Sequence, residues 1–271
     1  LTGYCLGGTL AAIVAAALAH NQPARLASLT LLAAQTDFEE PGEISLFIDD
    51  SQVSFLEDLM SLRGTLDAKQ MAGAFQMLRS QDLVWSRMIR EYLMGERPPM
   101  TDLMAWNADS TRMPFLMQSQ YLRSLFLGND LAQGRFEVEG KPVHIADIRV
   151  PVFALGTLTD HVAPWRSVFK VTRMFESDVT FVLTSGGHNA GVVSEPGNSK
   201  RSFQMLDLKH GSAHPNPDSW SAQAEQAQGS WWPAWTGWLA EGSGPQSALP
   251  PAGSKNYPPL CPAPGTYVRQ R

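Results

Sequence analysis

Three side chains that together can make and break an acyl bond occur at Cys5, Asp160 and His188. Cys5 lies in the run 3–7 (GYCLG), a G-x-nucleophile-x-G pattern with cysteine in place of serine. A cysteine attacks a carbonyl carbon as its thiolate, a histidine takes up and returns the proton, and a carboxylate orients the histidine. These residue types predict acyl transfer through a covalent intermediate on Cys5.

The pattern around the cysteine requires a sharp turn from a strand into a helix. Its glycines supply steric room for this turn, and a helix beginning near Gly8 would point its N-terminus at the sulfur. The helix dipole and free N–H groups favour the thiolate there. The backbone N–H of Leu6 would then stabilise a developing oxyanion. Taken alone, the five-residue match also fits a buried cysteine in a tight turn.

The positions of the acid and the base favour the catalytic interpretation. Asp160 follows the apolar run 150–156 (VPVFALG), and His188 follows the apolar run 179–184 (VTFVLT). α/β-Hydrolases carry nucleophile, acid and histidine in this chain order, each on a loop at the carboxyl end of a strand. The sequence therefore predicts an α/β-hydrolase fold with Cys5, Asp160 and His188 as its triad.

The remaining histidines and the second cysteine are weaker candidates. His161, directly after the acid, either touches substrate or supports the site structurally, and both interpretations stay open. Cys261 lies among prolines with no helix or base nearby, which argues against catalysis. Neither cysteine has a close Cys or His partner, so we expect no metal site. We expect structural or solvated roles for His20, His144, His210 and His214.

The chain alternates between α/β patterns and a helical stretch. Residues 9–22 are nearly all helix formers, and 26–34 form an apolar run of strand length. Residues 43–94 carry apolar side chains at helical spacing, among them Phe75 and Leu78, and prolines follow at 98–99. A further helix is expected near 165–176. This order predicts an α/β fold with a helical lid inserted between nucleophile and acid.

The predicted organisation has four segments. Residues 218–240 are expected to form one Trp-rich helix packed on the body, followed by an extended tail over 241–271. We expect Trp231, Trp232 and the neighbouring tryptophans to be packing anchors. The segments are 1–35 with the nucleophile turn, 36–143 as the lid, 144–210 with the acid and histidine loops, and the Trp/Pro-rich 211–271.

Composition excludes several other classes of protein. The 271 residues suffice for one large domain or a domain with an inserted cap, and 44% are hydrophobic. A net charge of −5 gives no electrostatic case for binding nucleic acid or anionic membranes. No apolar run approaches the roughly 20 residues that span a bilayer. The two distant cysteines fit a reducing, cytosolic setting.

The start of the sequence falls inside a motif. The first residue is Leu1, without a methionine. We therefore expect this chain to be a fragment that lacks the upstream strands and the second oxyanion donor. A sheet without those strands would have an exposed edge, so the fragment could be inactive or insoluble alone.

The run 3–10 (GYCLGGTL) resembles the lipase-like box of polyhydroxyalkanoate synthases. Further blocks of that family's pattern follow in the right order to the end of the chain. These blocks are 102–114 (DLMAWNADSTRMP), 160–165 (DHVAPW), 185–188 (SGGH), 229–233 (GSWWP) and 262–268 (PAPGTYV). The W-N-x-D-x-T-R-x-P and G-S-W-W-P blocks are far more specific than the first. One departure is the histidine loop, 186–189 (GGHN), where many members have one glycine before the histidine and an apolar residue after it; we expect little consequence.

The resemblance implies the catalytic C-terminal portion of an acyltransferase that polymerises (R)-3-hydroxyacyl-CoA into polyester and releases coenzyme A. It implies no cofactor, because the coenzyme A thioester is itself the substrate. It also implies a homodimer on cytoplasmic storage granules, where granule surface proteins are further partners. The chain resembles the single-subunit synthases that take short-chain monomers somewhat more than it resembles the medium-chain synthases. By family position, Trp106, Tyr121 and Asn129 are lid or channel residues, with plain lid packing as the alternative.

The expected mechanism has two steps. His188 helps to ionise Cys5, the thiolate takes the acyl group from coenzyme A, and a chain or monomer hydroxyl then attacks the acyl-enzyme. Asp160 either orients His188 or acts directly on the hydroxyl. One rival function is a thioesterase or esterase that uses the same triad with water. A second is a non-catalytic granule or structural protein.

Overall fold

A mixed six-stranded sheet forms the centre of the molecule. The computed structural model describes residues 1–67, 70–71, 73, 84–97, 99–108, 112–263 and 265–266. The strand order is β1-β2-β7-β8-β9-β10, in which β1, β2, β7 and β8 are parallel and β9 is antiparallel to both of its neighbours, β8 and β10. The strands are β1 (Thr2–Tyr4), β2 (Leu29–Leu32), β7 (Val152–Thr157), β8 (Val179–Thr184), β9 (Ser202–Leu208) and β10 (Glu225–Gln228). Every residue of β2, β7 and β8 is buried, as expected of strands covered on both faces.

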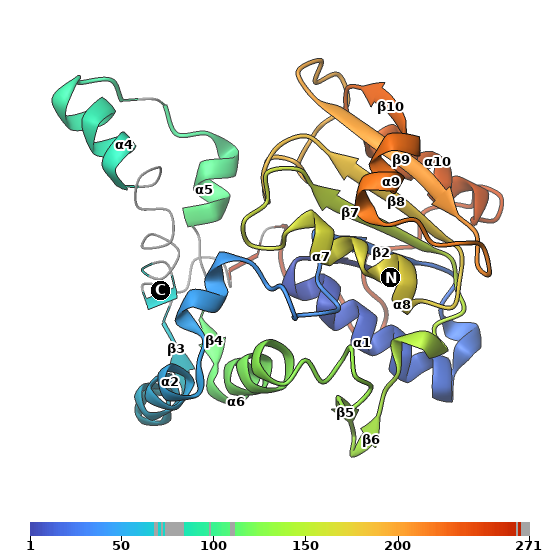
Figure 1. The fold of residues 1–271 in the computed structure, drawn as a ribbon, viewed down its shortest axis with the longest axis horizontal. Helices are drawn as coiled ribbons and strands as arrows, with labels where there is room; N and C mark the ends of the chain where they lie inside the picture. The colour runs from blue at the N-terminus through green and yellow to red at the C-terminus, as the bar shows by residue number, and fades with distance from the viewer. Residues whose placement is uncertain are drawn as a thin grey trace.

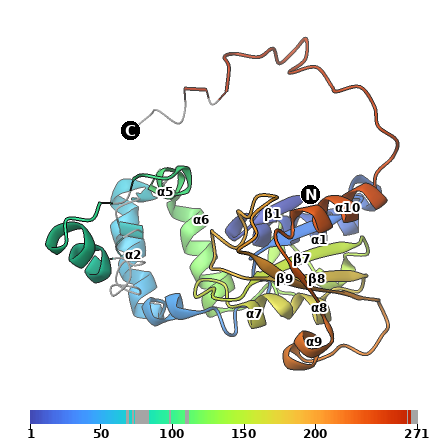
Figure 2. The same cartoon turned by 90° about the horizontal axis from the view of Figure 1, so that it is seen from above.

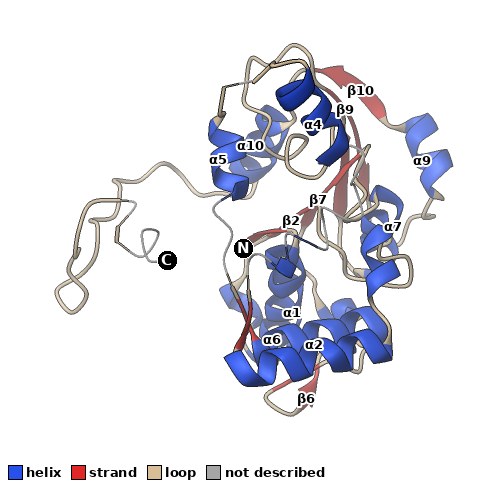
Figure 3. Ribbon diagram, turned by 90° about the vertical axis from the view of Figure 1, so that its left-hand side faces the viewer, coloured by secondary structure: helices blue, strands red, loops and turns tan. Residues whose placement is uncertain are grey.

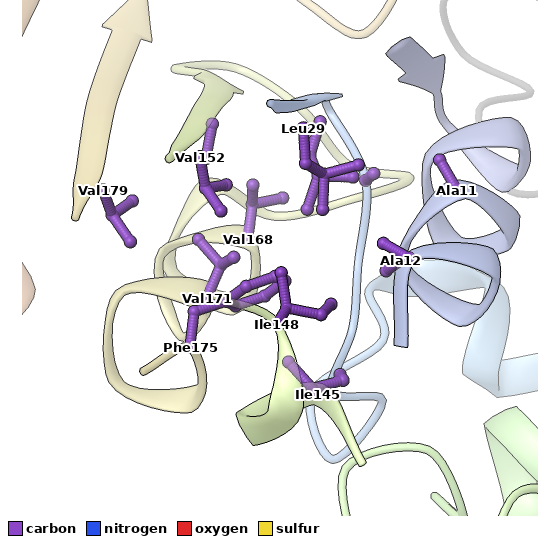
Figure 4. Close-up of a cluster of buried hydrophobic side chains, with 14 of the residues drawn as sticks. Ala11, Ala12, Leu29, Ile145, Ile148, Val152, Val168, Val171, Phe175 and Val179 are labelled. Carbon is purple, nitrogen blue, oxygen red and sulfur yellow. The ribbon is translucent and has the colours of Figure 1, made fainter. Parts of the chain in front are cut away.

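Helices α1, α7 and α8 cover one face of the sheet (Figures 1 and 3). They span Leu6–Asn21, Trp165–Phe169 and Val171–Met174. The face that α1 turns to the sheet is built from buried alanines, including Ala11 and Ala12, whose small side chains let helix and strand approach closely. Figure 4 shows these alanines beside Leu29 and Val152 in the larger hydrophobic core.

The opposite face is covered by α10 (Trp232–Glu241). Trp231 is 1% exposed and packs with Phe153 and Leu155 in a second core cluster, against which Trp232, Trp235 and Trp238 also pack. These tryptophans are therefore packing anchors, as the sequence predicted. The C-terminal part of the chain thus completes the three-layer fold.

Between β2 and β7 the chain makes a mostly helical excursion, which Figures 1 and 2 show at one side of the sheet. A two-stranded ribbon, β3 (Thr65–Leu66) with β4 (Met113–Pro114), joins its two halves. Its helices are α2 (Asp50–Arg63), α4 (Ser86–Met88), the π-helix η4 (Ile89–Leu93), α5 (Asp102–Ala108), α6 (Phe115–Gln120) and the π-helix η5 (Tyr121–Leu127). Phe75, Leu78 and residues 109–111 of the family block lie outside the described residues. That this segment is a separate lid domain stays a prediction.

A short stretch leads from this excursion back to the sheet. It holds the hairpin of β5 (Glu137–Val138) with β6 (Lys141–Pro142) and the 3₁₀ turn η6 (Ile145–Asp147). Ile145 and Ile148 are buried in the larger core, which they share with Ala11 and Ala12 of α1 (Figure 4).

The prediction of one helix over 218–240 was wrong. The structure has α9 (Pro217–Gln223), then β10, then α10. The intervening residues are polar helix formers that become a strand because they pair antiparallel with β9, from Glu225 opposite Met205 to Gln228 opposite Ser202. Pro233, in the first turn of α10, is incompatible with the interior of a long helix and could have signalled the break.

Past α10 the described residues contain no further helix or strand, and Figure 2 shows them running away from the body. Positions 264, 267 and 268 of the last family block lie outside the described residues. Among the helices that the structure describes, none has the length and hydropathy needed to cross a membrane.

Candidate active site

Cys5 occupies the turn between β1 and α1. Its backbone has φ 53° and ψ −125°, a conformation that a residue with a side chain rarely adopts. The turn is held by its own hydrogen bonds: Cys5 N–H donates to Leu32 O at 2.9 Å, and Gly8 N–H donates to Cys5 O at 2.9 Å. The strained residue is thus the cysteine itself, which projects from the carboxyl edge of the sheet.

Two glycines, Gly3 and Gly8, make this turn possible, and only Gly3 is one of the two that frame the five-residue pattern. A Cβ on Gly3 would lie 2.3 Å from Gly7 O, and one on Gly8 would lie 2.3 Å from Ala34 Cβ. A Cβ on Gly7 would meet nothing within 4 Å. Gly3 and Gly8 therefore allow β1 and α1 to approach each other, whereas Gly7 is not required by packing.

Leu6 is the first residue of α1, so its backbone N–H has no acceptor within the helix. Gly3, Gly8 and the buried alanines bring this helix end against the sheet beside Cys5. The location is that of an oxyanion donor, and the role of Leu6 stays a prediction.

Asp160 lies three residues beyond β7 and is held from several sides. Its Oδ2 accepts a hydrogen bond from Thr157 Oγ1 at 2.8 Å, and its Oδ1 accepts the N–H groups of Val162 and Ala163, each at 2.9 Å. The side chain is fully buried. Burial works to raise the pKa of Asp160, but the hydrogen bonds, first that of His188, outweigh it and hold this pKa below its usual value. The carboxylate stays ionised.

His188 lies in the loop after β8, and its Nδ1 is 2.7 Å from Asp160 Oδ2. Because the carboxylate is an acceptor, Nδ1 carries the proton. Nε2 is buried and forms no hydrogen bond of ordinary geometry with a described residue, but His188 interacts electrostatically with Cys5. Burial works to lower the pKa of His188; Asp160 and Cys5 outweigh it and raise this pKa to about 10. The structure thus brings together the three residues of the predicted triad, whose catalytic roles remain to be tested.

Tyr4 is a site residue that the sequence analysis missed. Its hydroxyl lies 2.5 Å from Asn189 Oδ1 and 3.3 Å from His188 O, and its ring centroid is 5.2 Å from that of His188. Burial first, and then the charges of Cys5 and Asp160, raise the pKa of Tyr4, so the hydroxyl remains a donor. No local signal marks it, since Tyr4 is simply the variable position before the nucleophile.

The G-S-W-W-P block holds the loop that follows His188. Ser230 Oγ donates to Ser194 O at 2.5 Å. The indole N–H groups of Trp231 and Trp232 donate to Gly191 O and Val192 O, each at 3.0 Å. Three consecutive residues of the C-terminal segment therefore bind backbone carbonyls of the histidine loop. The structural role of the G-S-W-W-P block is to anchor this loop.

Trp106 and Tyr121 both lie near the candidate nucleophile. The Trp106 ring centroid is 6.4 Å from that of Tyr4, and the side chain is 53% exposed. Burial first, and then the charge of Cys5, raise the pKa of Tyr121. Tyr121 also packs edge-on against Phe38, so it joins the excursion to the core.

Asn129 and His161 contribute to loop structure. Asn129 Oδ1 accepts the Phe38 N–H at 2.9 Å, and its Nδ2 donates to Asp37 Oδ1 at 3.2 Å, which ties the end of η5 to the loop after β2. His161 O accepts the Glu43 N–H at 3.2 Å. For Asn129 these contacts favour the packing alternative; for His161 both interpretations stay open.

His210 and His214 are four residues apart, a spacing that would bring two imidazoles together on a helix. They lie instead in a turn and an irregular stretch after β9. Among the described residues, no group of three or more His, Cys, Asp or Glu side chains has the arrangement of a metal site.

Comparison with known proteins identifies the fold family and finds similar proteins that are named polymerases. A model of the α/β hydrolase fold family matches residues 1–194, which confirms the predicted fold. The poly(3-hydroxyalkanoate) polymerase of Methylorubrum extorquens is 41% identical over 270 residues, covering 99% of this chain and 44% of that protein. The poly(3-hydroxyalkanoate) polymerase subunit PhaC of Cupriavidus necator is 36% identical over 280 residues, covering 99% of this chain and 46% of that protein. The chain thus spans less than half the length of these relatives.

Among solved structures, an α/β fold family hydrolase from Bacillus anthracis aligns with 70% of this chain and 61% of its own. It is 15% identical, and the TM-score is 0.35.

Proposed function

Because this chain belongs to the α/β hydrolase fold family, we propose that it is the catalytic portion of a polyhydroxyalkanoate polymerase with Cys5 as nucleophile. The observation that carries the proposal is the similarity to named polymerases over 99% of the chain, combined with a cysteine at the nucleophile turn beside His188. The alternative, a Cys-dependent thioesterase or esterase, is not favoured, because the similar curated proteins are named polymerases.

The first proposed step transfers the acyl group to the enzyme. The Cys5 thiolate attacks the carbonyl carbon of an (R)-3-hydroxyacyl-CoA, and the oxyanion that forms accepts the Leu6 N–H. The carbon–sulfur bond to coenzyme A then breaks, and the leaving thiolate takes the proton from His188. Since the pKa of His188 is raised to about 10, the imidazole is protonated at neutral pH and can supply that proton.

The second proposed step extends the polyester. His188, now neutral, removes the proton from the hydroxyl of a growing chain or a second monomer, and the alkoxide attacks the acyl carbon on Cys5. An ester bond forms, the bond to the Cys5 sulfur breaks, and the thiolate is regenerated beside a protonated His188. Asp160 holds the proton on Nδ1 throughout; a direct action of Asp160 on the hydroxyl is the remaining alternative.

The helical excursion is proposed to keep water from the acyl-enzyme, which distinguishes a polymerase from a hydrolase. Within it, Arg123 ties η5 to α2 through Glu57, with Nη2 and Oε2 2.6 Å apart. Trp106 and Tyr121 extend the excursion toward Cys5 and are proposed to line the path of the acyl chain.

The whole protein is proposed to be a homodimer built from one type of subunit. It is proposed to act on polyester granules in the cytoplasm, in contact with granule surface proteins, and to prefer short-chain monomers. No cofactor is proposed, because coenzyme A enters as part of the substrate. Catalysis rests on the Cys5 thiol and on proton transfer by His188.

The test is coenzyme A release from (R)-3-hydroxybutyryl-CoA by the full-length protein and by its Cys5→Ser variant, with analysis of the product. We expect release together with chloroform-soluble polyester, both lost in the variant. Release with only free 3-hydroxybutyrate would contradict the polymerase function, and release by Cys5→Ser at the native rate would contradict the nucleophile.

A further inference from the structure

The Tyr4 side chain connects the nucleophile turn to the histidine loop. Tyr4 precedes the nucleophile, Asn189 follows the base, and the Tyr4 hydroxyl lies 2.5 Å from Asn189 Oδ1 although the two residues are 185 positions apart. The same hydroxyl is 3.3 Å from His188 O, so it contacts both the backbone of His188 and the side chain of Asn189. The asparagine is also where this chain departs from the apolar residue of many polyhydroxyalkanoate synthases.

We propose that Tyr4 and Asn189 are positioning residues that hold the imidazole of His188 at its working distance from the Cys5 sulfur. The inference rests on the proposed role of Cys5 and His188 and adds a hydrogen bond that fixes the distance between their side chains. We name the Tyr4–Asn189 hydrogen bond the elbow latch.

The imidazole needs such a restraint because Asp160 holds it through one ring nitrogen only. The hydrogen bond at Nδ1 fixes that atom, while the ring can still swing about it and move Nε2 away from the sulfur. The Tyr4 ring blocks this movement from one side, at 5.2 Å between ring centroids. The elbow latch in turn prevents the Tyr4 ring and the histidine loop from separating.

The rest of the loop is already anchored on its far side. Trp231 and Trp232 hold the carbonyls of Gly191 and Val192, and Gly191 N–H donates to Gly187 O at 2.8 Å. These contacts set the backbone after Asn189 but do not touch the nucleophile turn. The Tyr4 hydroxyl, by contrast, reaches from that turn to the base loop, where it meets Asn189 Oδ1 and His188 O.

The groups that influence the pair come from three directions. Cys5 and Tyr4 lie on the nucleophile turn, Asp160 on the acid loop and Tyr121 on η5. Of these, Asp160 and Cys5 interact with His188 directly, and the tyrosine hydroxyls stay protonated. The pH dependence of thiol reactivity at Cys5 therefore reports how close His188 lies to the sulfur.

The test measures the rate of Cys5 alkylation by iodoacetamide against pH in the full-length protein, with the Cys5 peptide quantified by mass spectrometry. The variants are Tyr4→Phe, Asn189→Ala and the double variant, each checked for folding by circular dichroism. Tyr257→Phe makes the same chemical change at an exposed tyrosine and serves as the matched control. Cys261, also exposed, gives an internal reference for thiol reactivity within each sample.

We expect Tyr4→Phe and Asn189→Ala each to slow Cys5 alkylation at pH 6 by about 3- to 10-fold, the range that the loss of one hydrogen bond implies. Their profiles should move to higher pH, and the double variant should be no slower than the slower single variant. The control should leave the profile unchanged.

Wild-type profiles in both single variants, or effects that multiply in the double variant, would overturn the proposal. Should Tyr4→Phe fail to fold, Asn189→Ala alone decides the same question, because it leaves the tyrosine ring in place. The assay needs no polymerisation. A protein that makes no polyester but shows the coupled shifts would refute the proposed function and keep the elbow latch.

Discussion

The Nδ1 atom of His188 lies 2.7 Å from Oδ2 of Asp160, a carboxylate with a fully buried side chain. Two backbone N–H groups and the Thr157 hydroxyl donate hydrogen bonds that orient this carboxylate independently of the histidine. The acid is therefore oriented by its own loop, and the histidine takes its orientation from the acid. Proton transfer at Nε2 therefore depends on the hydrogen bonds that orient Asp160 as well as on the one between Asp160 and His188.

Asp160→Asn tests whether the acid only orients the base. An amide at this position leaves the buried Nδ1–H without a carboxylate, so we expect enzyme acylation and chain elongation to fall together by roughly 10⁴-fold. Single-turnover acylation and steady-state polymer formation would be measured on the same preparation. Intact acylation with lost elongation would contradict a purely orienting role and favour direct action on the hydroxyl.

The pKa of His188 predicts how stability depends on pH. This pKa rises from 6.5 to about 10 on folding, so its contribution is fully present below about pH 6.5 and is lost as the pH rises through 10. The pKa of Asp160 is lowered from 3.8, so its contribution is present above about pH 4 and is lost in acid. The excess unfolding free energy of wild type over His188→Gln should therefore be greatest between about pH 4 and 6.5 and should shrink toward pH 10.

Urea unfolding at several pH values would measure this difference. His20→Gln, the same substitution at an exposed histidine at the end of α1, is the matched control. A difference that grows above pH 6.5 would contradict the assignment.

Trp232→Phe tests the anchoring of the histidine loop. The change keeps an aromatic ring but removes the N–H that donates to Val192 O at 3.0 Å, and we expect a loss of about 1 kcal/mol of unfolding free energy. Trp85→Phe, at a half-exposed tryptophan of the excursion, should cost far less. Equal losses in the two variants, measured by urea denaturation, would show that the N–H carries no stability.

The two neighbouring glycines of the nucleophile turn should respond in opposite ways to alanine. Gly8→Ala would place a methyl group 2.3 Å from Ala34 Cβ, and we expect a loss of about 3 kcal/mol or more. Gly7→Ala meets nothing within 4 Å and fills a helical position, so we expect a gain of about 0.5–1 kcal/mol. Thermal unfolding of both variants decides; similar destabilisation by the two would contradict the packing argument.

The parts of the fold that were predictable are those with a local signal. The run 179–184 matches β8 in both bounds, because a continuous apolar run between loops fits only a strand covered on both faces. The proximity of Cys5, Asp160 and His188 followed from their positions after the parallel strands β1, β7 and β8, whose carboxyl ends share one edge of the sheet. Polar β10 had no such signal, since its conformation comes from pairing with β9.

The contacts that support the site could not be predicted from the sequence for a similar reason. Asn189 was expected to matter little, yet its side chain meets Tyr4 across 185 positions of sequence. The requirement for Gly8 rather than Gly7 depends on where Ala34 lies after β2. Such contacts are set by tertiary packing, which neither residue type nor spacing reports.

The most direct test of the central claim is to trap the acyl-enzyme. Full-length protein would be mixed with (R)-3-hydroxybutyryl-CoA, quenched in acid within one turnover, digested and analysed by mass spectrometry. We predict a 3-hydroxybutyryl group, or a short oligomer of it, on the peptide that contains Cys5, and none in Cys5→Ala. Coenzyme A release with the acyl group on another residue, or with no covalent intermediate at any time point, would contradict the account.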